Sequence, residues 1–159
     1  MLKKLAILIA AASLATPALA ARDLAARDLA DDNWLGQAQE INKIQIGQRD
    51  PGARRMMIKS GTTPAKRTVS YPVRLEAGKF YGFMADCDFE CNEAKLTLTQ
   101  NGQEIESFSQ AENSSPMFSL RANRTGEYKL NYTITDCEKD RCAYSVEVYK
   151  GNREYDMNF

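Results

Sequence analysis

The sequence predicts an all-β fold, an antiparallel sandwich or barrel of about eight short strands that follows one short helix. Apolar and polar residues alternate with a period of two in most segments between residues 57 and 148. Turn residues separate these segments at intervals typical of antiparallel sheets. Between residues 33 and 45 the apolar residues instead lie three and four positions apart, as in a helix.

The alternation is clearest where Tyr128, Leu130, Tyr132 and Ile134 are separated by polar residues. Pro72 has no amide hydrogen to donate, so its strand is expected at a sheet edge or opposite a bulge. Asn101-Gly102 predicts a tight hairpin, because a type I′ turn needs positive φ at both central residues. The other predicted strands carry Met57–Ile58, Val69–Leu75, Phe80–Ala85, Ala94–Leu98, Ile105–Phe108, Phe118–Leu120 and Tyr144–Val148.

The predicted helix covers about residues 33–45, with a cap among Asp31, Asp32 and Asn33. The face that it is expected to turn inward carries Trp34, Leu35, Ala38, Ile41 and Ile44. Before the helix, residues 21–30 repeat the pentapeptide ARDLA, which is too short a repeat for a solenoid.

The first twenty residues are typical of a secretory signal peptide. Lys3 and Lys4 precede an apolar run over residues 5–14, and Ala18-Leu19-Ala20 forms a cleavage site of small residues. The run is shorter than the roughly 20 residues that cross a bilayer, and no other segment is long enough to be a membrane span. We therefore expect a periplasmic or secreted protein with four parts. These are a signal peptide (1–20), a leader and helix (21–50), a β-sandwich (51–151) and a tail (152–159).

Composition argues against several classes of function. The chain has no His, which excludes Ser-His-Asp and Cys-His catalysis and most catalytic zinc sites. Its 21 basic and 21 acidic residues balance, and removing the signal peptide takes away two Lys and no acid, leaving a slight negative charge. Nucleic-acid binding usually requires a basic surface. We expect no enzyme, no nucleic-acid partner and no cofactor other than a possible calcium ion.

Four cysteines, Cys87, Cys91, Cys137 and Cys142, form two closely spaced pairs. An even number in an exported chain favours disulfides. Of the three connectivities, we favour Cys87–Cys91 and Cys137–Cys142, because each pair brackets a loop at the end of a strong strand. A crossed pairing between the two loops is the alternative. The spacings do not suit a zinc site or a thiol redox motif.

Acidic and aromatic residues supply two candidate ligand sites. Asp86, Asp88, Asp136 and Asp140 flank the cysteines, and they could bind calcium if the two loops lie side by side. Ordinary solvated loop charge is the simpler interpretation. Aromatic residues could bind a glycan if they are exposed. The alternation predicts that Phe83, Tyr128, Tyr132 and Tyr144 are in the core, and leaves Tyr81, Phe89 and Tyr149 as candidates for the surface.

Several motifs then occur in a fixed order: LEAGKFY at 75–81, CDFEC at 87–91, KLTL at 95–98, the Asn101-Gly102 turn and TGEY at 125–128. This order resembles the bacterial pre-peptidase C-terminal domain, over roughly residues 68–150. The resemblance implies a small, exported, non-catalytic β-sandwich of the jelly-roll type. It also implies an accessory role beside a larger protein, although no peptidase accompanies this chain.

The leading functional hypothesis is a non-enzymatic periplasmic or secreted domain that binds or supports another envelope protein. One alternative is a glycan- or calcium-binding module. Another is a small inhibitor of an envelope hydrolase, which would use a loop such as residues 110–116 as a plug.

Overall fold

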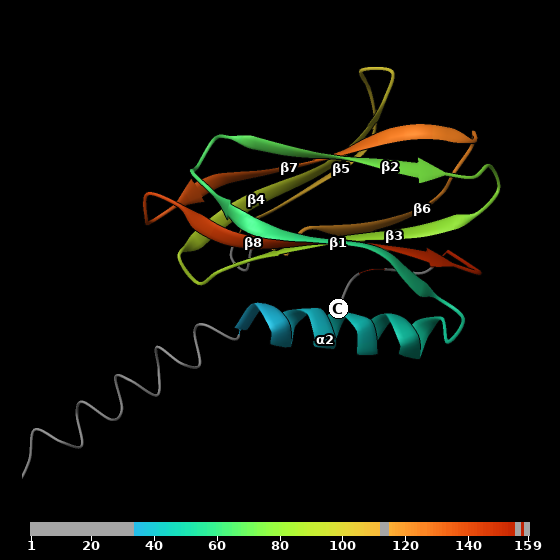
Figure 1. Ribbon diagram of the computed structural model, residues 1–159, viewed down its shortest axis with the longest axis horizontal. Coiled ribbons are helices and arrows are strands. Elements are labelled where there is room, and N and C mark those ends of the chain that lie inside the picture. The colour runs from blue at the N-terminus through green and yellow to red at the C-terminus, as the bar shows by residue number, and fades with distance from the viewer. Residues whose placement is uncertain (1–33, 112–114, 155–156, 158–159) are drawn as a thin grey trace, which may run out of the picture. The chain divides into compact units, whose positions relative to one another are not determined.

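The computed structural model describes residues 34–111, 115–154 and 157, and for residues 110 and 111 it describes the backbone alone (Figure 1). The predicted signal peptide, the ARDLA repeat and the helix cap lie outside these residues. The elements are α2 (Trp34–Arg49), β1 (Arg54–Thr63), β2 (Thr68–Leu75), β3 (Phe80–Cys87), β4 (Cys91–Gln100), β5 (Gln103–Ala111), β6 (Met117–Arg121), β7 (Gly126–Cys137) and β8 (Cys142–Gly151).

The strands form two four-stranded antiparallel sheets that pack face to face (Figure 1). Sheet A has the order β1-β8-β3-β6, and sheet B has the order β2-β7-β4-β5. The predicted fold, an antiparallel jelly-roll-like sandwich of about eight strands with a short helix before it, is therefore confirmed. Pro72 lies on β2, an edge strand of sheet B, where no further strand needs its missing amide hydrogen.

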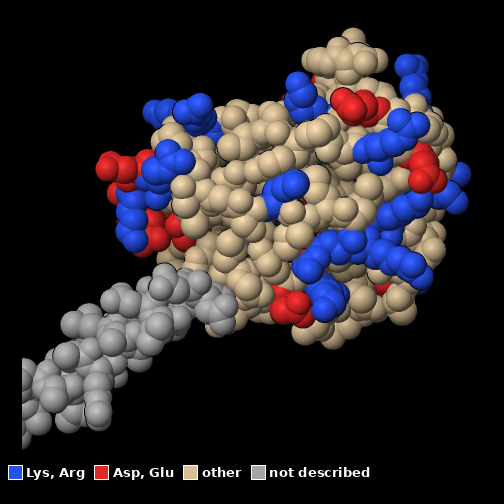
Figure 2. Space-filling model, viewed as in Figure 1, with Lys and Arg blue, Asp and Glu red and all other residues tan. Residues whose placement is uncertain are grey.

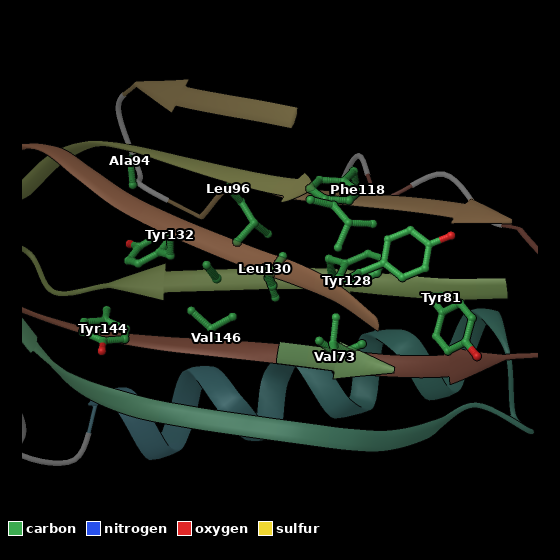
Figure 3. Packing of buried hydrophobic residues seen from close by; sticks show 14 of the residues in the cluster. Val73, Tyr81, Ala94, Leu96, Phe118, Tyr128, Leu130, Tyr132, Tyr144 and Val146 are labelled. Carbon is green, nitrogen blue, oxygen red and sulfur yellow. The ribbon is translucent and has the colours of Figure 1, made fainter. Parts of the chain in front are cut away.

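The main core lies between the two sheets and is made mainly by alternate residues of β2, β3, β4, β6, β7 and β8 (Figure 3). The aromatic rings of Phe83 and Phe118 stack with their centroids 5.0 Å apart, and those of Tyr132 and Tyr144 lie 5.4 Å apart. The four aromatic residues predicted to be in the core are all buried: Phe83, Tyr128, Tyr132 and Tyr144. Alternation with a period of two thus located this core correctly.

The β4–β5 hairpin turns at Asn101 and Gly102, whose φ values are 52° and 79°. Both residues have the positive φ that a type I′ turn requires, so the predicted hairpin is confirmed. Only glycine adopts such a φ without a steric penalty.

Replacing Gly102 with Ala is expected to lower the free energy of unfolding by about 1 kcal/mol, because an alanine Cβ is strained at positive φ. Gly47 is a matched control, since it lies in α2 and an added Cβ would contact nothing within 4 Å. Ala favours a helix over Gly, so Gly47→Ala should raise stability by about 0.5–1 kcal/mol. Urea denaturation measures both changes. Equal effects of the two substitutions would contradict the assigned turn.

The helix α2 packs on the outer face of sheet A and runs along β8. Gln39 bonds to Ser145, and Asn42 bonds to Glu147 two residues further along the strand. Near the end of the helix, Ile46 packs in one cluster with Tyr149. Successive turns of α2 therefore meet successive outward residues of β8, with alternate strand residues left for the main core.

The predicted inward face of the helix is wrong for two of its residues. Ile41 and Ile44 are 53% and 57% exposed, whereas the buried residues of α2 are Asn42 and Ile46. The reason is the surface on which the helix packs, because sheet A presents carboxylates and hydroxyls there. Burying those groups requires hydrogen-bond donors, so the polar side of the helix turns inward.

A second apolar cluster lies between α2 and sheet A. It consists of Ile46, Met84, Tyr149 and Met157, with Ala53 and Met117 packed against them. Met157 belongs to the tail that the sequence left unassigned, and it is buried here. The outer face of sheet A is therefore covered by the helix and, in part, by Met157.

Candidate functional site

Two disulfides lie at one end of the sandwich, which we call the disulfide end. Cys87 bonds to Cys91, and Cys137 bonds to Cys142, so the favoured local pairing is confirmed. Each bond joins a strand of sheet A to a strand of sheet B. Cys91 and Cys137 are also partners in the β4–β7 register, which places the bonds side by side. The two disulfides thus hold the sheets together at this end.

Phe89 lies on the short loop that the Cys87–Cys91 bond closes, and 77% of its surface is exposed. Its ring centroid is 6.3 Å from that of Trp34, at the start of α2. Further along the same helix, Ile41 and Ile44 are also exposed. We call the surface formed by Trp34, Ile41, Ile44 and Phe89 the Phe89 face.

Backbone contacts fix the conformation of the Phe89 loop. The Cys91 amide donates to the Asp88 carbonyl at 3.0 Å, and the Glu138 amide donates to the Glu90 carbonyl at 2.8 Å. A carboxylate oxygen of Asp88 also accepts the Ala143 amide at 2.5 Å. These bonds and the disulfide anchor both sides of the loop, so Phe89 is displayed on a constrained backbone.

A shallow groove lies beside the helix, between α2 and β6, with a volume of about 240 Å³. Ala38 and Ile41 line one side and Met117 the other, and Asn42 and Asp86 also contribute to its lining. Ile41 belongs both to this groove and to the Phe89 face, so the groove adjoins that face.

Beneath the helix, Asn42 connects two buried carboxylates. Its side-chain amide donates to Asp86 Oδ2 at 2.7 Å and to Glu147 Oε1 at 2.9 Å. The second oxygen of Glu147 accepts from Arg55 Nη1 at 3.0 Å and from the Tyr149 hydroxyl at 2.7 Å. This polar network, together with Ile46, attaches α2 to sheet A.

Asp86 is 7% exposed, and burial raises its pKa above the ordinary value even though Asn42 and Ser115 donate hydrogen bonds to it. The nearby Glu147 carboxylate raises the pKa further. An Asp–Glu pair could in principle perform acid–base catalysis. Here both carboxylates lie beneath α2 and accept hydrogen bonds from Asn42 and from other side chains of the network. We therefore assign the network the role of positioning the helix.

At the end of α2, Asp50 ties the helix to the end of β8. Its Oδ1 accepts from the Gly52 amide at 3.1 Å and from the Asn152 side chain at 3.0 Å, while Oδ2 accepts the Asn152 amide at 2.5 Å. Burial acts to raise the pKa of Asp50, but the bonds from Asn152 and Gly52 outweigh it and lower the pKa below its ordinary value. The ionised form is therefore the one that the fold stabilises.

Asp50→Asn is expected to cost about 2 kcal/mol of unfolding free energy at pH 7, because charge-assisted bonds are lost. A lowered pKa stabilises the fold fully above the ordinary value of about 3.9, and this contribution is lost as pH falls from there through the lowered pKa. The gap between wild type and variant should therefore narrow below about pH 4. Urea denaturation of both proteins between pH 7 and pH 3 measures this difference in unfolding free energy. The exposed Asp140→Asn change is the control, and a gap that does not depend on pH would contradict the assignment.

Two of the three aromatic residues suggested for the surface are buried. Tyr81 and Tyr149 are 1% and 2% exposed, so only Phe89 is available to a ligand. Tyr81 points into the main core, and its hydroxyl accepts the Glu76 amide. Tyr149 points the other way, under α2. The prediction was wrong because β3 and β8 are covered on both faces, so alternation there does not separate buried from exposed residues.

The four aspartates suggested for calcium do not converge. Asp86 faces α2 on the outer side of sheet A, whereas Asp136 accepts a hydrogen bond from Asn92 on sheet B. Asp140 lies in the exposed turn between β7 and β8. Within the described parts of the chain, no group of three or more His, Cys, Asp or Glu is placed to hold a metal ion. These four aspartates, suggested as candidate calcium ligands, therefore do not form one cluster in the described structure.

No helix among the described residues is long and apolar enough to span a membrane.

The loop suggested as an inhibitory plug, residues 110–116, lies largely outside the described side chains. The groove beside α2 and the polar network had no sequence signal of their own, because both depend on which residues of two sheets and a helix meet.

No protein-family model matches the chain, and no curated protein matches it. Among solved structures, it is similar to PliG of Aeromonas hydrophila, a periplasmic inhibitor of g-type lysozyme (14% identity, 63% of this chain and 89% of that chain, TM-score 0.44). It is also similar to the CBM36-1 domain of a xylanase from a Trinervitermes trinervoides hindgut metagenome (14% identity, 66% of this chain and 94% of that chain, TM-score 0.39). A third similar structure is the pre-peptidase C-terminal domain of a Bacillus anthracis collagenase (14% identity, 58% of this chain and 87% of that chain, TM-score 0.47). The domain that the sequence resembles is therefore among the solved structures to which this chain is similar.

Proposed function

We propose that this chain is an exported, non-enzymatic β-sandwich that binds another protein of the cell envelope through the Phe89 face. The observation that carries the proposal is the exposure of Phe89 on a disulfide-closed loop, beside Trp34. Aromatic residues are enriched among those that dominate binding energy at protein interfaces. A contiguous exposed apolar surface is a common mark of an interaction site.

The construction of the Phe89 face favours binding. The loop is held by a disulfide and by backbone hydrogen bonds, so little conformational entropy is lost when a partner engages it. The helix that carries Ile41 and Ile44 is attached to sheet A by the buried polar network. Both parts of the face are therefore presented on supported backbone.

Charge indicates the kind of partner. The loops of the disulfide end and the last residues of β7 carry five carboxylates: Asp88, Glu90, Asp136, Glu138 and Asp140. Only two cations, Lys139 and Arg141, occur in the same loops; Lys139 pairs with Glu90, and Arg141 bonds to Thr62. The surplus is negative, so the complementary partner has an apolar cleft bordered by Lys or Arg.

Chemistry and compartment support the other parts of the proposal. The chain has no His, and the buried carboxylates of Asp86 and Glu147 lie beneath α2. Both disulfides suit an oxidising compartment such as the periplasm or the exterior. An accessory domain needs only a stable scaffold and a displayed surface, and this fold supplies both.

The experiment compares capture by three tagged mature proteins in the native envelope: wild type, Phe89→Ala and Phe108→Ala. Phe108 is a matched control, because it is an exposed Phe (38%) on β5, outside the Phe89 face. We expect a basic protein to be recovered with wild type and with Phe108→Ala, and to be lost with Phe89→Ala.

The partner is then purified, and its affinity is measured at two salt concentrations. Removal of a central aromatic anchor should weaken binding by about 2 kcal/mol or more, and added salt should slow association. Equal binding by Phe89→Ala and wild type would overturn the proposal. Recovery of glycan fragments in place of a protein would do the same.

A further inference from the structure

The opposite end of the sandwich collects basic residues. Antiparallel pairing brings together the start of β1, the start of β3 and the ends of β6 and β8. Arg54, Lys79, Arg121 and Lys150 lie at or next to these strand ends. Figure 2 shows Lys and Arg gathered over the corresponding region, on the right of the view. This basic end is separate from the disulfide end that carries Phe89.

A pocket of about 530 Å³ lies at the basic end. Three cationic side chains line it, Arg54 from β1, Lys79 from the turn before β3, and Lys150 from β8. Glu76 also lines the pocket, and its Oε1 is 2.7 Å from Lys150 Nζ. No ion pair to Arg54 or Lys79 is found among the described residues. The pocket therefore has more positive than negative charge.

Two of these cations are neighbours across the sheet, and Glu76 forms an ion pair with only one of them. Arg54 and Lys150 are directly opposite each other in the β1–β8 register. Like charges at opposed positions of an antiparallel pair are destabilising. An oxyanion between them would remove the repulsion. It would also compete with Glu76 for the Lys150 ammonium group.

We propose that this pocket binds a phosphate group. Arg offers parallel donors that match two phosphate oxygens, and the two Lys ammonium groups can approach the remaining charge. Asn152 also lines the pocket, although its amides already donate to Asp50. The phosphate group belongs either to a soluble molecule or to a phospholipid headgroup. The site goes beyond the proposed protein-binding role, and it leaves the Phe89 face free.

Inorganic phosphate is the first probe, added to the isotope-labelled mature chain with chloride at equal ionic strength as reference. We expect saturable amide shifts over residues 78–80 and 150–152, with a dissociation constant of the order of millimolar. Arg54→Gln with Lys79→Gln should weaken binding at least tenfold. Arg67→Gln is the matched control, since it removes one exposed cation from the loop before β2 and should leave affinity unchanged.

Circular dichroism and a melting curve confirm that the double variant is folded before titration. Phosphatidylglycerol and phosphatidylcholine vesicles then distinguish the two sources of phosphate. Sedimentation with phosphatidylglycerol alone, lost in the double variant, identifies a lipid headgroup. Absence from both vesicles with a saturable phosphate titration identifies a soluble ligand. The proposal is overturned if phosphate gives no saturable shift in the pocket, or if the double variant binds as tightly as wild type.

Discussion

Replacing Arg55 with Met is expected to lower the free energy of unfolding by about 3 kcal/mol, because it leaves a buried carboxylate without its counterion. Glu147 is fully buried, and Arg55 is the only cation paired with it among the described residues. The pKa of Arg55 is raised by its hydrogen bond to Glu147, even though burial acts to lower it. Urea denaturation at pH 7 in phosphate-free buffer measures the loss.

A neighbouring residue provides the control for this prediction. Arg54→Met removes an exposed guanidinium one position earlier and should change stability by less than about 0.5 kcal/mol. Adding Glu147→Gln to the Arg55→Met protein removes the unpaired charge and should restore part of the loss. If Arg55→Met and Arg54→Met have equal effects, or if the second substitution restores nothing, the buried pair does not have the role assigned to it.

Replacing all four cysteines with Ala is expected to cost about 4 kcal/mol, at roughly 2 kcal/mol for each short loop on the chain-entropy account. The effect should be large because both bonds join sheet A to sheet B at the same end. Replacing only Cys137 and Cys142 should cost about half as much. Denaturation of oxidised and reduced wild type provides a second measure that needs no substitution.

The cysteine variants also distinguish the effect of the disulfides on stability from their effect on the conformation of the Phe89 loop. Without the Cys87–Cys91 bond, the Phe89 loop should exchange its amide hydrogens faster, whereas removal of Cys137–Cys142 alone should affect residues 138–141 most. A total cost below about 1 kcal/mol would contradict the role assigned to these bonds. Unchanged exchange in residues 88–90 would show that hydrogen bonds alone hold the loop.

The sandwich itself could be predicted from the sequence because β2, β4 and β7 of sheet B each have one face in the core and one in solvent. Residues such as Leu96, Leu98 and Leu130 therefore alternate with polar neighbours. The turn at Gly102 and the edge position of Pro72 follow from backbone chemistry that depends on single residues. Such local constraints can be read without knowing what packs nearby.

Sheet A could not be interpreted in the same way, since α2 covers its outer face. Residues Phe80–Cys87 form a nearly continuous buried strand, so alternation along this strand does not indicate whether Tyr81 is buried or exposed. Such an apolar run is consistent with burial on both faces, and that signal could have corrected the assignment of Tyr81. The polar outward residues of β8, Ser145 and Glu147, suggested solvent where the helix in fact lies.

The helix was predicted correctly as an element, but its orientation depends on sheet A. Apolar spacing favoured Ile41 as a buried residue, while the carboxylates of Asp86 and Glu147 required a donor such as Asn42. The Phe89 face is a consequence of that requirement, because it leaves Ile41 and Ile44 outside. Similarly, Asp86 and Asp136 each adjoin a cysteine in the sequence but lie on different sheets.

Site-specific photocrosslinking in the native cell tests the central claim, that the Phe89 face contacts a protein partner. A photoreactive residue is placed singly at position 89, at position 44 on the same face, and at position 129 on the exposed side of sheet B. We predict one common crosslinked protein at positions 89 and 44, and none at position 129. Crosslinking at position 129 alone, or no crosslinked protein at positions 89 and 44, would contradict the account.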